Sequence, residues 1–308
     1  MLGVLAALGG GALWGFSGSC AQLVFTTYGL EPIWVISVRA SVGAVLVMLL
    51  ACVMRGRRVL DVVKRPKNIA LVIAFGLFGL ALTQFTYLMA INHSNAGTAT
   101  MLEYIGPVFV VFVVCAIKRH APQVRELVAL ACVVAGVFVL STHGDPTQLV
   151  LTPDALGWGL ASAVSMVFYT LLPAPLLKQH DNLSVLAWAM IVAGAVMVAW
   201  QRPWESVPVM DAFGWIALFG GLTCMGTVAA FSLYYYAVKA IGPSRTSMLA
   251  SVEVVSATVF AALLGTPFEA MDVLGLVLIM ATVFLLAKRS DPATPSDLAS
   301  PTTQSDPR

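Results

Sequence analysis

Residues 84–114 read QFTYLMAINHSNAGTATMLEYIGPVFVVFVV, and residues 231–261 read FSLYYYAVKAIGPSRTSMLASVEVVSATVFA. At an offset of 147 residues, Tyr87 aligns with Tyr234, Ala90 with Ala237, Met101 with Met248 and Leu102 with Leu249. The connector near residues 92–96 has no Lys or Arg, whereas its counterpart lies between Lys239 and Arg245. Because Lys and Arg mark the cytoplasmic side of short membrane loops, the two copies are predicted to have opposite orientations. Inverted repeats of apolar helices are typical of secondary transporters.

The composition predicts an all-α integral membrane protein. The chain has 308 residues, of which 59% are hydrophobic and 10% charged, whereas a soluble domain has about 25% charged residues. Ten apolar stretches of about 17–27 residues approach or exceed the ~20 that a spanning helix needs. They lie at about 3–24, 33–54, 68–91, 95–117, 126–142, 155–177, 183–200, 212–238, 243–264 and 271–287. Strands are excluded because the runs are continuous and not alternating.

The charges predict the orientation of these ten helices. Basic residues fall in alternate connectors: Arg55, Arg57, Arg58, Lys64, Arg65, Lys67, Lys118, Arg119, Arg125, Lys178, Lys239, Arg245, Lys288 and Arg289. The opposite connectors contain Arg202 and the acids Glu31, Asp145, Asp154, Glu205, Asp211, Glu269 and Asp272. This asymmetry predicts a multi-pass protein with both termini cytoplasmic, in a bacterial inner membrane.

The same pattern divides the chain into two halves. Residues 1–142 and 155–289 are predicted to be five-helix repeats, joined by an external linker at 143–154. Five helices is an odd number, so the second repeat must be inverted relative to the first. Residues 290–308 lack core-forming residues and are predicted to be a disordered cytoplasmic tail. The first apolar stretch is interpreted as an ordinary span, because no basic segment precedes it as in a signal peptide.

Three formal charges lie well inside the predicted spans: Arg39, Glu103 and Glu253. A charge near the middle of a bilayer costs about 2.5–3.5 kcal/mol on insertion scales, so these side chains must face the protein interior or water. One interpretation is that they bind substrate or protons. The other is structural, with Arg39 forming an ion pair with Glu103.

Prolines lie in the interior of two predicted spans. Pro107 removes an amide donor and frees the carbonyl of Glu103, four residues earlier. Freed carbonyls are tolerated in membranes where they face protein or a wet cavity, and transporter sites form at such breaks. A simple helix kink is the alternative. Pro173 and Pro175 are predicted to kink the sixth span near the cytoplasm.

Polar and aromatic side chains gather on a few spans at helical spacing. The candidate substrate-binding residues are Trp14, Gln84, Tyr87, Thr100, Glu103, Tyr104, Ser232, Tyr235, Ser247, Ser251 and Glu253. Rings that stack and hydroxyls that bind a head group suit a neutral or zwitterionic ligand with an apolar body. Membrane-interface belts are the alternative for Tyr and Trp. Gly11, Gly15 and Ser19 recur every four residues, which predicts close helix packing in the first span.

Several short motifs resemble one family. They are Trp14-Gly15, Arg39, Thr98-Ala99-Thr100, Gly106-Pro107-Val108-Phe109 and Ser251-Val252-Glu253-Val254. Together they resemble the drug/metabolite transporter superfamily, EamA type. The resemblance implies ten helices and export of small metabolites, amino acids among them, by alternating access of two five-helix bundles. It also implies that the fifth and tenth helices lie outside the substrate cavity. The family often has Glu-Pro at Glu253-Val254, so the ninth helix is expected to be straighter here.

The predicted function is a secondary transporter that exports small metabolites, with amino acids as the first candidate. No nucleotide-binding Gly-Lys-Ser/Thr motif is present, so a gradient, such as one of protons, or the substrate itself must supply the drive. The expected partners are a small-molecule substrate and the lipid bilayer, without cofactor, metal or nucleic acid. Ten helices can enclose one pathway, which allows a functional monomer. The alternatives are a passive facilitator of the same fold, a drug exporter and a membrane-embedded lipid-group transferase. The last is disfavoured because no catalytic cluster is present, so the chain is not expected to be an enzyme.

Overall fold

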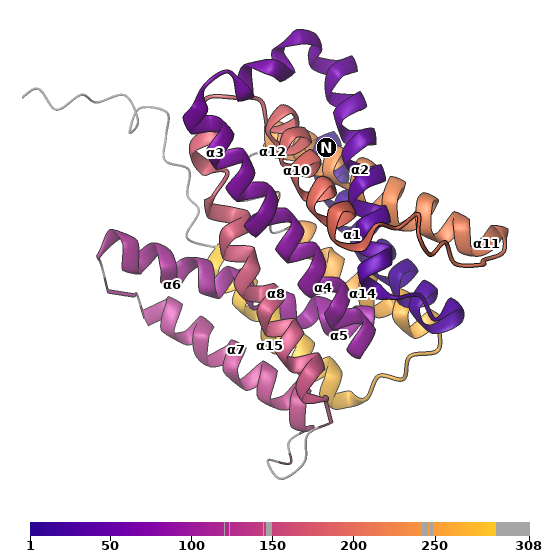
Figure 1. Ribbon diagram of the computed structural model, residues 1–308. Helices are drawn as coiled ribbons and strands as arrows, with labels where there is room; N and C mark the ends of the chain where they lie inside the picture. The colour runs from indigo at the N-terminus through magenta and orange to yellow at the C-terminus, as the bar shows by residue number, and fades with distance from the viewer. Residues whose placement is uncertain are drawn as a thin grey trace, which may run out of the picture.

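The computed structural model describes residues 1–119, 121–122, 124–143, 145, 150–241, 246 and 249–287. The helices of the first half are α1 (Leu2–Tyr28), α2 (Pro32–Arg55), η1 (Gly56–Val63), α3 (Pro66–Ala74), η2 (Phe75–Ala81), α4 (Leu82–His93), α5 (Ala96–Glu103), α6 (Gly106–Lys118) and α7 (Val124–Thr142) (Figure 1). Those of the second half are α8 (Pro153–Leu171), α9 (Ala174–Leu177), α10 (Asn182–Gln201), α11 (Ala212–Trp215), η3 (Ile216–Ala229), α12 (Ala230–Ile241), α14 (Val252–Leu263) and α15 (Ala270–Ala287).

By length and composition, seven helical stretches in the described residues can cross a membrane. They are Leu2–Tyr28, Pro32–Val63, Pro66–His93, Ala96–Ile117, Pro153–Leu177, Asn182–Gln201 and Ala212–Tyr234. Three shorter apolar helices accompany them, at Leu127–Leu140, Val252–Leu263 and Ala270–Ala281. The protein is therefore an all-α membrane protein, as the composition predicted.

The helix ends follow from local sequence. The α1 helix ends at Gly29, which adopts a left-handed conformation (φ 60°) at little steric cost. The α2 helix begins with Pro32, where a missing N–H leaves nothing unpaired. The α5 helix begins after Asn95, whose side chain accepts a hydrogen bond from the Thr98 amide, and Asp181 caps α10 in the same way.

Two long helices contain segments with wide, π-type turns. One is η2, between α3 and α4, and the other is η3, between α11 and α12. The offset of 147 that aligns the two halves in sequence carries 75–81 onto 222–228, inside η3. Both segments contain glycines that accept close neighbours. A Cβ on Gly76 would lie 2.6 Å from Val192 Cβ, and one on Gly226 would collide with Ser17. Such wide turns are frequent at functional sites.

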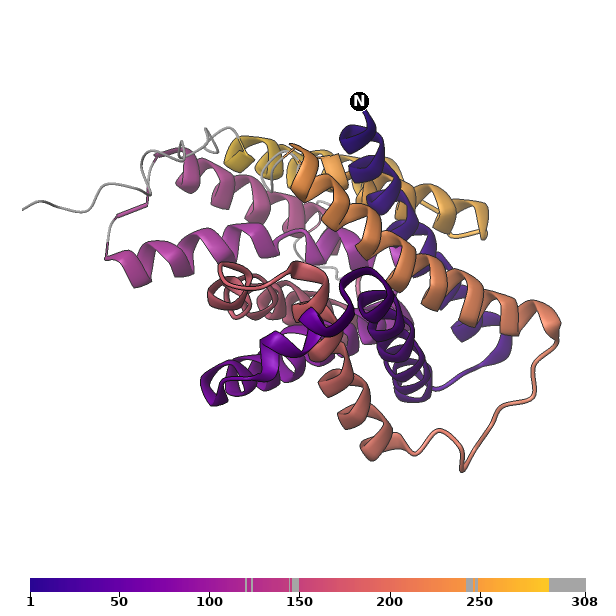
Figure 2. The same cartoon turned by 90° about the horizontal axis from the view of Figure 1, so that it is seen from above.

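The packing of the two halves follows one pattern. The α1 helix packs against η3, α12 and α14, and the α8 helix packs against the corresponding η2, α4, α5 and α6. The α2 helix pairs with α10, and α7 pairs with α15. Figures 1 and 2 show α6, α7 and α15 side by side at one edge of the bundle. Exchanging the halves therefore preserves the main helix contacts.

Small residues let α1 approach α14 closely. A Cβ on Gly15 would lie 2.6 Å from the Glu253 carbonyl oxygen, and one on Gly11 would collide with the Ala250 carbonyl. The Ser256 hydroxyl donates to the Ala12 carbonyl across the same contact at 3.2 Å. The prediction of close packing in the first span is confirmed.

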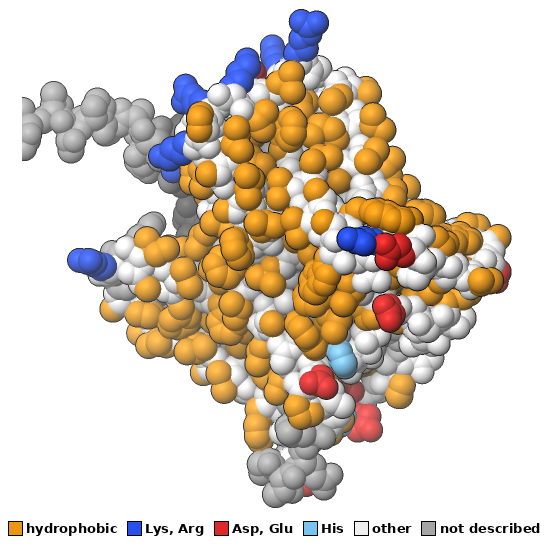
Figure 3. All heavy atoms as spheres, in the orientation of Figure 1, with side chains coloured by type: hydrophobic (Ala, Val, Ile, Leu, Met, Phe, Trp, Pro, Cys, Tyr) orange, Lys and Arg blue, Asp and Glu red, His pale blue; other side chains and the backbone are white. Residues whose placement is uncertain are grey.

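Charges separate toward opposite ends of the molecule. Figure 3 shows most Lys and Arg side chains at the upper end of this face, acidic side chains mainly toward the lower end, and hydrophobic surface between them. The exposed basic residues around η1 are Arg57, Arg58, Lys64, Arg65 and Lys67. This distribution is that of a protein whose middle is surrounded by lipid.

Candidate functional site

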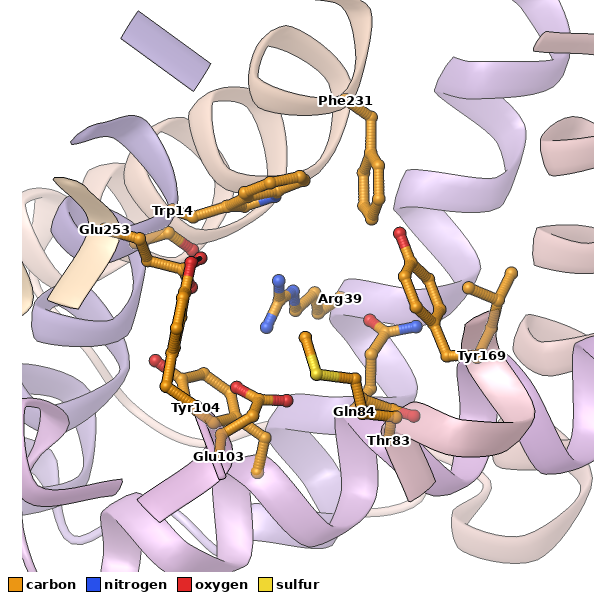
Figure 4. Close-up of a pocket in the computed structure, with 13 residues that line it drawn as sticks. Trp14, Arg39, Thr83, Gln84, Glu103, Tyr104, Tyr169, Phe231 and Glu253 are labelled. Carbon is orange, nitrogen blue, oxygen red and sulfur yellow. Dashed lines mark hydrogen bonds between the residues drawn. The ribbon is translucent and has the colours of Figure 1, made fainter. Parts of the chain in front are cut away.

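A cavity of about 130 Å³ lies between the two halves. Its lining residues are Trp14, Ser17, Arg39, Leu80, Thr83, Gln84, Tyr87, Glu103, Tyr104, Met166, Tyr169, Phe231 and Glu253 (Figure 4). A single water needs roughly 10–15 Å³, so this space admits a small ligand or several waters. In the described part of the chain, α7 and α15 supply none of the lining residues. The resemblance had implied this peripheral position for the fifth and tenth helices.

The Arg39 guanidinium points into the middle of this cavity from α2 (Figure 4). The side chain is only 7% exposed, and its Nε donates to Thr227 Oγ1 at a long 3.4 Å. Among the described residues, no carboxylate lies within ion-pairing distance of it. The structure therefore brings Arg39 and Glu103 to one cavity but does not form the direct ion pair that the structural interpretation of the sequence required.

Each carboxylate of the cavity accepts a hydrogen bond from the opposite half. Ser162 Oγ on α8 donates to Glu103 Oε1 at 3.0 Å. The Tyr104 hydroxyl donates to Glu253 Oε2 at 3.0 Å and lies 3.3 Å from the Ala250 carbonyl oxygen. These two crossed contacts tie the position of each carboxylate to the relative position of the halves.

The helix is interrupted at Tyr104, the hydrogen-bond partner of Glu253. The α5 helix ends at Glu103, residues 104–105 form a turn, and α6 begins at Gly106 with Pro107 in its first turn. This break turns Tyr104 toward the cavity. Pro173 lies in a second break, between α8 and α9.

Aromatic and amide groups complete the wall. Trp14 packs edge-on against Phe231, with ring centroids 5.1 Å apart, and lies 5.2 Å from the Tyr234 ring. Tyr169 lies beside Phe231 and Gln84 in the same wall (Figure 4). The Gln84 amide has one weak contact, to Met190 Sδ at 3.9 Å, and its Oε1 is buried without a hydrogen-bond partner. The cavity thus combines apolar surface with a few convergent polar groups.

The remaining sequence candidates lie around the cavity or away from it. Tyr87 lines it, and its hydroxyl lies 2.8 Å from that of the fully buried Thr100. Ser232 does not line the cavity, and its hydroxyl donates to the Val228 carbonyl at 2.6 Å. Ser251 is buried outside the lining. The Tyr235 side chain and Ser247 lie outside the described residues.

Sequence reasoning missed several residues of the site. They are the lining residues Ser17, Leu80, Thr83, Met166, Tyr169 and Phe231, together with Ser162 and Thr227 behind them. The repeat contained a signal for one of them, because the 147-residue offset carries Gln84 onto Phe231. For Ser162, 59 residues from its partner Glu103, the sequence contains no comparable signal.

A membrane-embedded cavity with buried charges and walls from both halves defines a transporter-like protein. The model of the EamA-like transporter family matches residues 1–142 and 155–288. The chain therefore belongs to this family, within the drug/metabolite transporter superfamily. It is a membrane transporter, and its partners are a small-molecule substrate and the lipid bilayer.

Individual relatives agree with this assignment. The chain is 32% identical over 286 residues to the uncharacterized inner membrane transporter YicL of Salmonella typhimurium, covering 92% of this chain and 95% of that one. It is 22% identical over 264 residues to an uncharacterized transporter of Archaeoglobus fulgidus, covering 84% and 90%. A solved crystal structure with 17% identity superposes with a TM-score of 0.61 over 94% of this chain and 99% of the other, which shows a shared fold.

Proposed function

We propose that this protein is a gradient-driven secondary transporter of the bacterial inner membrane. It exports small amphipathic metabolites, amino acids foremost, by alternating access at the cavity between the halves. The observation that carries the proposal is the convergence of Arg39, Glu103 and Glu253, from three separate helices, on one cavity inside a membrane protein. Ionisable groups at membrane depth mark substrate and ion pathways.

The proposed architecture is ten spanning helices in two inverted repeats, 1–142 and 155–289, with 143–154 outside and both termini cytoplasmic. Three observations support it: the main contacts survive exchange of the halves, wide turns occur at equivalent positions, and basic side chains gather at one end. The predicted tail at 290–308 lies outside the described residues. One chain supplies the whole lining of the cavity, which supports a functional monomer.

The charges of the cavity support coupling. One guanidinium and two carboxylates leave a surplus of one negative charge when all three are ionised. An unbalanced charge at this depth costs about 2.5–3.5 kcal/mol, and a proton bound to one of the carboxylates removes it. Competition between that proton and the ammonium group of the substrate for the same carboxylate links outward movement of substrate to inward movement of protons.

The test is counterflow in liposomes that contain the purified protein. A panel of labelled amino acids is measured with and without an imposed proton gradient. We expect saturable exchange of one class of amino acid, accelerated by the gradient. An exchange rate that is the same with and without the proton gradient indicates a passive facilitator. Exchange of amphipathic drugs alone indicates a drug exporter. Absence of flux across both panels contradicts the proposal.

A further inference from the structure

Among the described residues, the buried cation Arg39 has no carboxylate within ion-pairing distance, although Glu103 and Glu253 line the same cavity. Among the described residues, its one hydrogen bond is the long contact of Nε with Thr227. The two terminal nitrogens, which form the fork of the guanidinium, point into the cavity (Figure 4). A buried charge is normally paired, because transfer from water without a partner is costly. A ligand bound in the cavity can supply such a direct partner.

The hydrogen-bond acceptors of the residues that line the cavity also lack some of their partners. Glu103 accepts from Ser162 through Oε1, and Glu253 accepts from Tyr104 through Oε2. The structure shows no partner for the second oxygen of either carboxylate among the described residues, and Gln84 Oε1 is buried without one. Glu103, Glu253 and Gln84 thus line the same cavity as the forked guanidinium of Arg39.

We propose that Arg39 binds the carboxylate of the substrate and that Glu103, Glu253 and Gln84 face its ammonium group, so that the cavity selects small zwitterions. A guanidinium binds a planar carboxylate through two parallel N–H···O bonds, a geometry that a lysine does not offer. Trp14 and Phe231 provide apolar surface for the rest of the molecule. The inference rests on the proposed function and adds the orientation of the substrate and the residues that bind its two charged groups.

Four compounds that share the branched side chain of leucine separate the contributions of its two charged groups: leucine, leucinamide, isoamylamine and isocaproate. Each is added to purified protein, and the ligand-induced rise in unfolding temperature gives its affinity without requiring transport. We expect leucine to bind roughly 10–100-fold more tightly than the three analogues, because each analogue leaves a buried charged group unpaired. Equal binding of isoamylamine and leucine, or binding by none of the four, overturns the inference.

Substitutions of Arg39 test whether this residue causes the preference for leucine over the three analogues. Arg39→Gln should reduce leucine binding to the level of isoamylamine and leave isoamylamine binding unchanged, with Arg39→Lys between the two. Arg202→Gln, which removes an exposed arginine paired with Glu205 at 3.2 Å, is the matched control and should bind like the unmodified protein. An Arg39→Gln variant that binds leucine normally overturns the inference. If Arg39→Gln does not fold, the four-compound series on the unmodified protein still decides.

Different experimental results would contradict the proposed transport and the proposed zwitterion site. Binding of leucine without counterflow contradicts the proposed transport and leaves the zwitterion site standing. Counterflow of isoamylamine that excludes leucine contradicts the zwitterion site and leaves transport standing.

Discussion

Substituting alanine for Gly15 should separate α1 from α14 at the functional site. The new Cβ would collide with the Ser256 hydroxyl and would lie 2.6 Å from the carbonyl oxygen of Glu253 and from the amide nitrogen of Ala257. Ordinary contacts of this kind begin at 3.4 Å, so one helix backbone must move by about 0.8 Å. The Ser256 hydroxyl can rotate away, but the other two neighbours are backbone atoms and cannot. The displacement therefore reaches Glu253 directly.

The expected size follows from two opposing effects. Overpacking a tight contact costs about 1–3 kcal/mol, whereas alanine in place of glycine favours a helix by about 1 kcal/mol. The net loss of stability for Gly15→Ala is therefore about 0–2 kcal/mol. Misplacing a binding group by almost 1 Å can reduce a rate by roughly 100-fold, so transport should fall by about 10–100-fold.

Gly157→Ala is the matched control, because a Cβ at Gly157 on α8 meets nothing within 4 Å. It should be as stable as the unmodified protein or more stable, with normal transport. The measurements are the free energy of unfolding in mixed detergent micelles and the initial counterflow rate in liposomes. Gly15→Ala with the stability and transport of Gly157→Ala would refute the packing argument.

Three further predictions test other contacts. Tyr104→Phe keeps the ring but removes the hydroxyl that donates a hydrogen bond to Glu253. Because a hydrogen bond to a charged group contributes about 1.5–3 kcal/mol, the initial transport rate should fall at least tenfold. An unchanged rate would exclude a role for this hydrogen bond in transport. The Tyr28 hydroxyl donates to Asp211 Oδ1 at 2.6 Å and lowers the pKa of Asp211 below its ordinary 3.8. A carboxylate with a lowered pKa stabilises the fold while it is ionised and ceases to do so as pH falls through its pKa in the folded state. Asp211→Asn should therefore unfold at a lower temperature than the unmodified protein at pH ~7 and at the same temperature at pH ~2, and an equal difference at both pH values would contradict this. Val209→Cys, at a fully exposed position in the connector before α11, should react with a membrane-impermeant maleimide added to intact cells, and labelling only after lysis would reverse the proposed orientation.

The helices could be read from the sequence because lipid imposes their length and internal hydrogen bonding. The stretch predicted at 33–54 is α2 (Pro32–Arg55), and the one at 183–200 is α10 (Asn182–Gln201). The ends agree because proline, glycine and capping side chains mark them locally. The break after Glu103 also has a local cause in the following Gly106-Pro107.

The inward faces of the helices were harder to predict. A membrane helix is apolar on its lipid side as well as its buried side, so periodicity does not distinguish them. Tyr169 and Met166 on α8 were missed for this reason. Ser232 was placed at the site from its spacing, but a helical serine can bond the carbonyl four residues earlier, as it does here with Val228.

The wide turns added a second difficulty. In η2 and η3 the chain turns more slowly than in an α-helix, so residues beyond them face a different direction from the one that regular spacing predicts. Glycines at 76, 79, 220, 221 and 226 mark these segments. Glycine alone does not distinguish a wide turn from a packing contact, so the sequence left both open.

The most direct test of the central claim is gradient-driven transport by Glu253→Gln in liposomes. Glutamine keeps the size of the side chain and an oxygen that accepts from Tyr104, but it cannot exchange a proton. The account predicts that counterflow persists while accumulation against a concentration gradient, driven by protons, is lost at unchanged expression. Accumulation equal to that of the unmodified protein would show that Glu253 does not couple transport and would contradict the account.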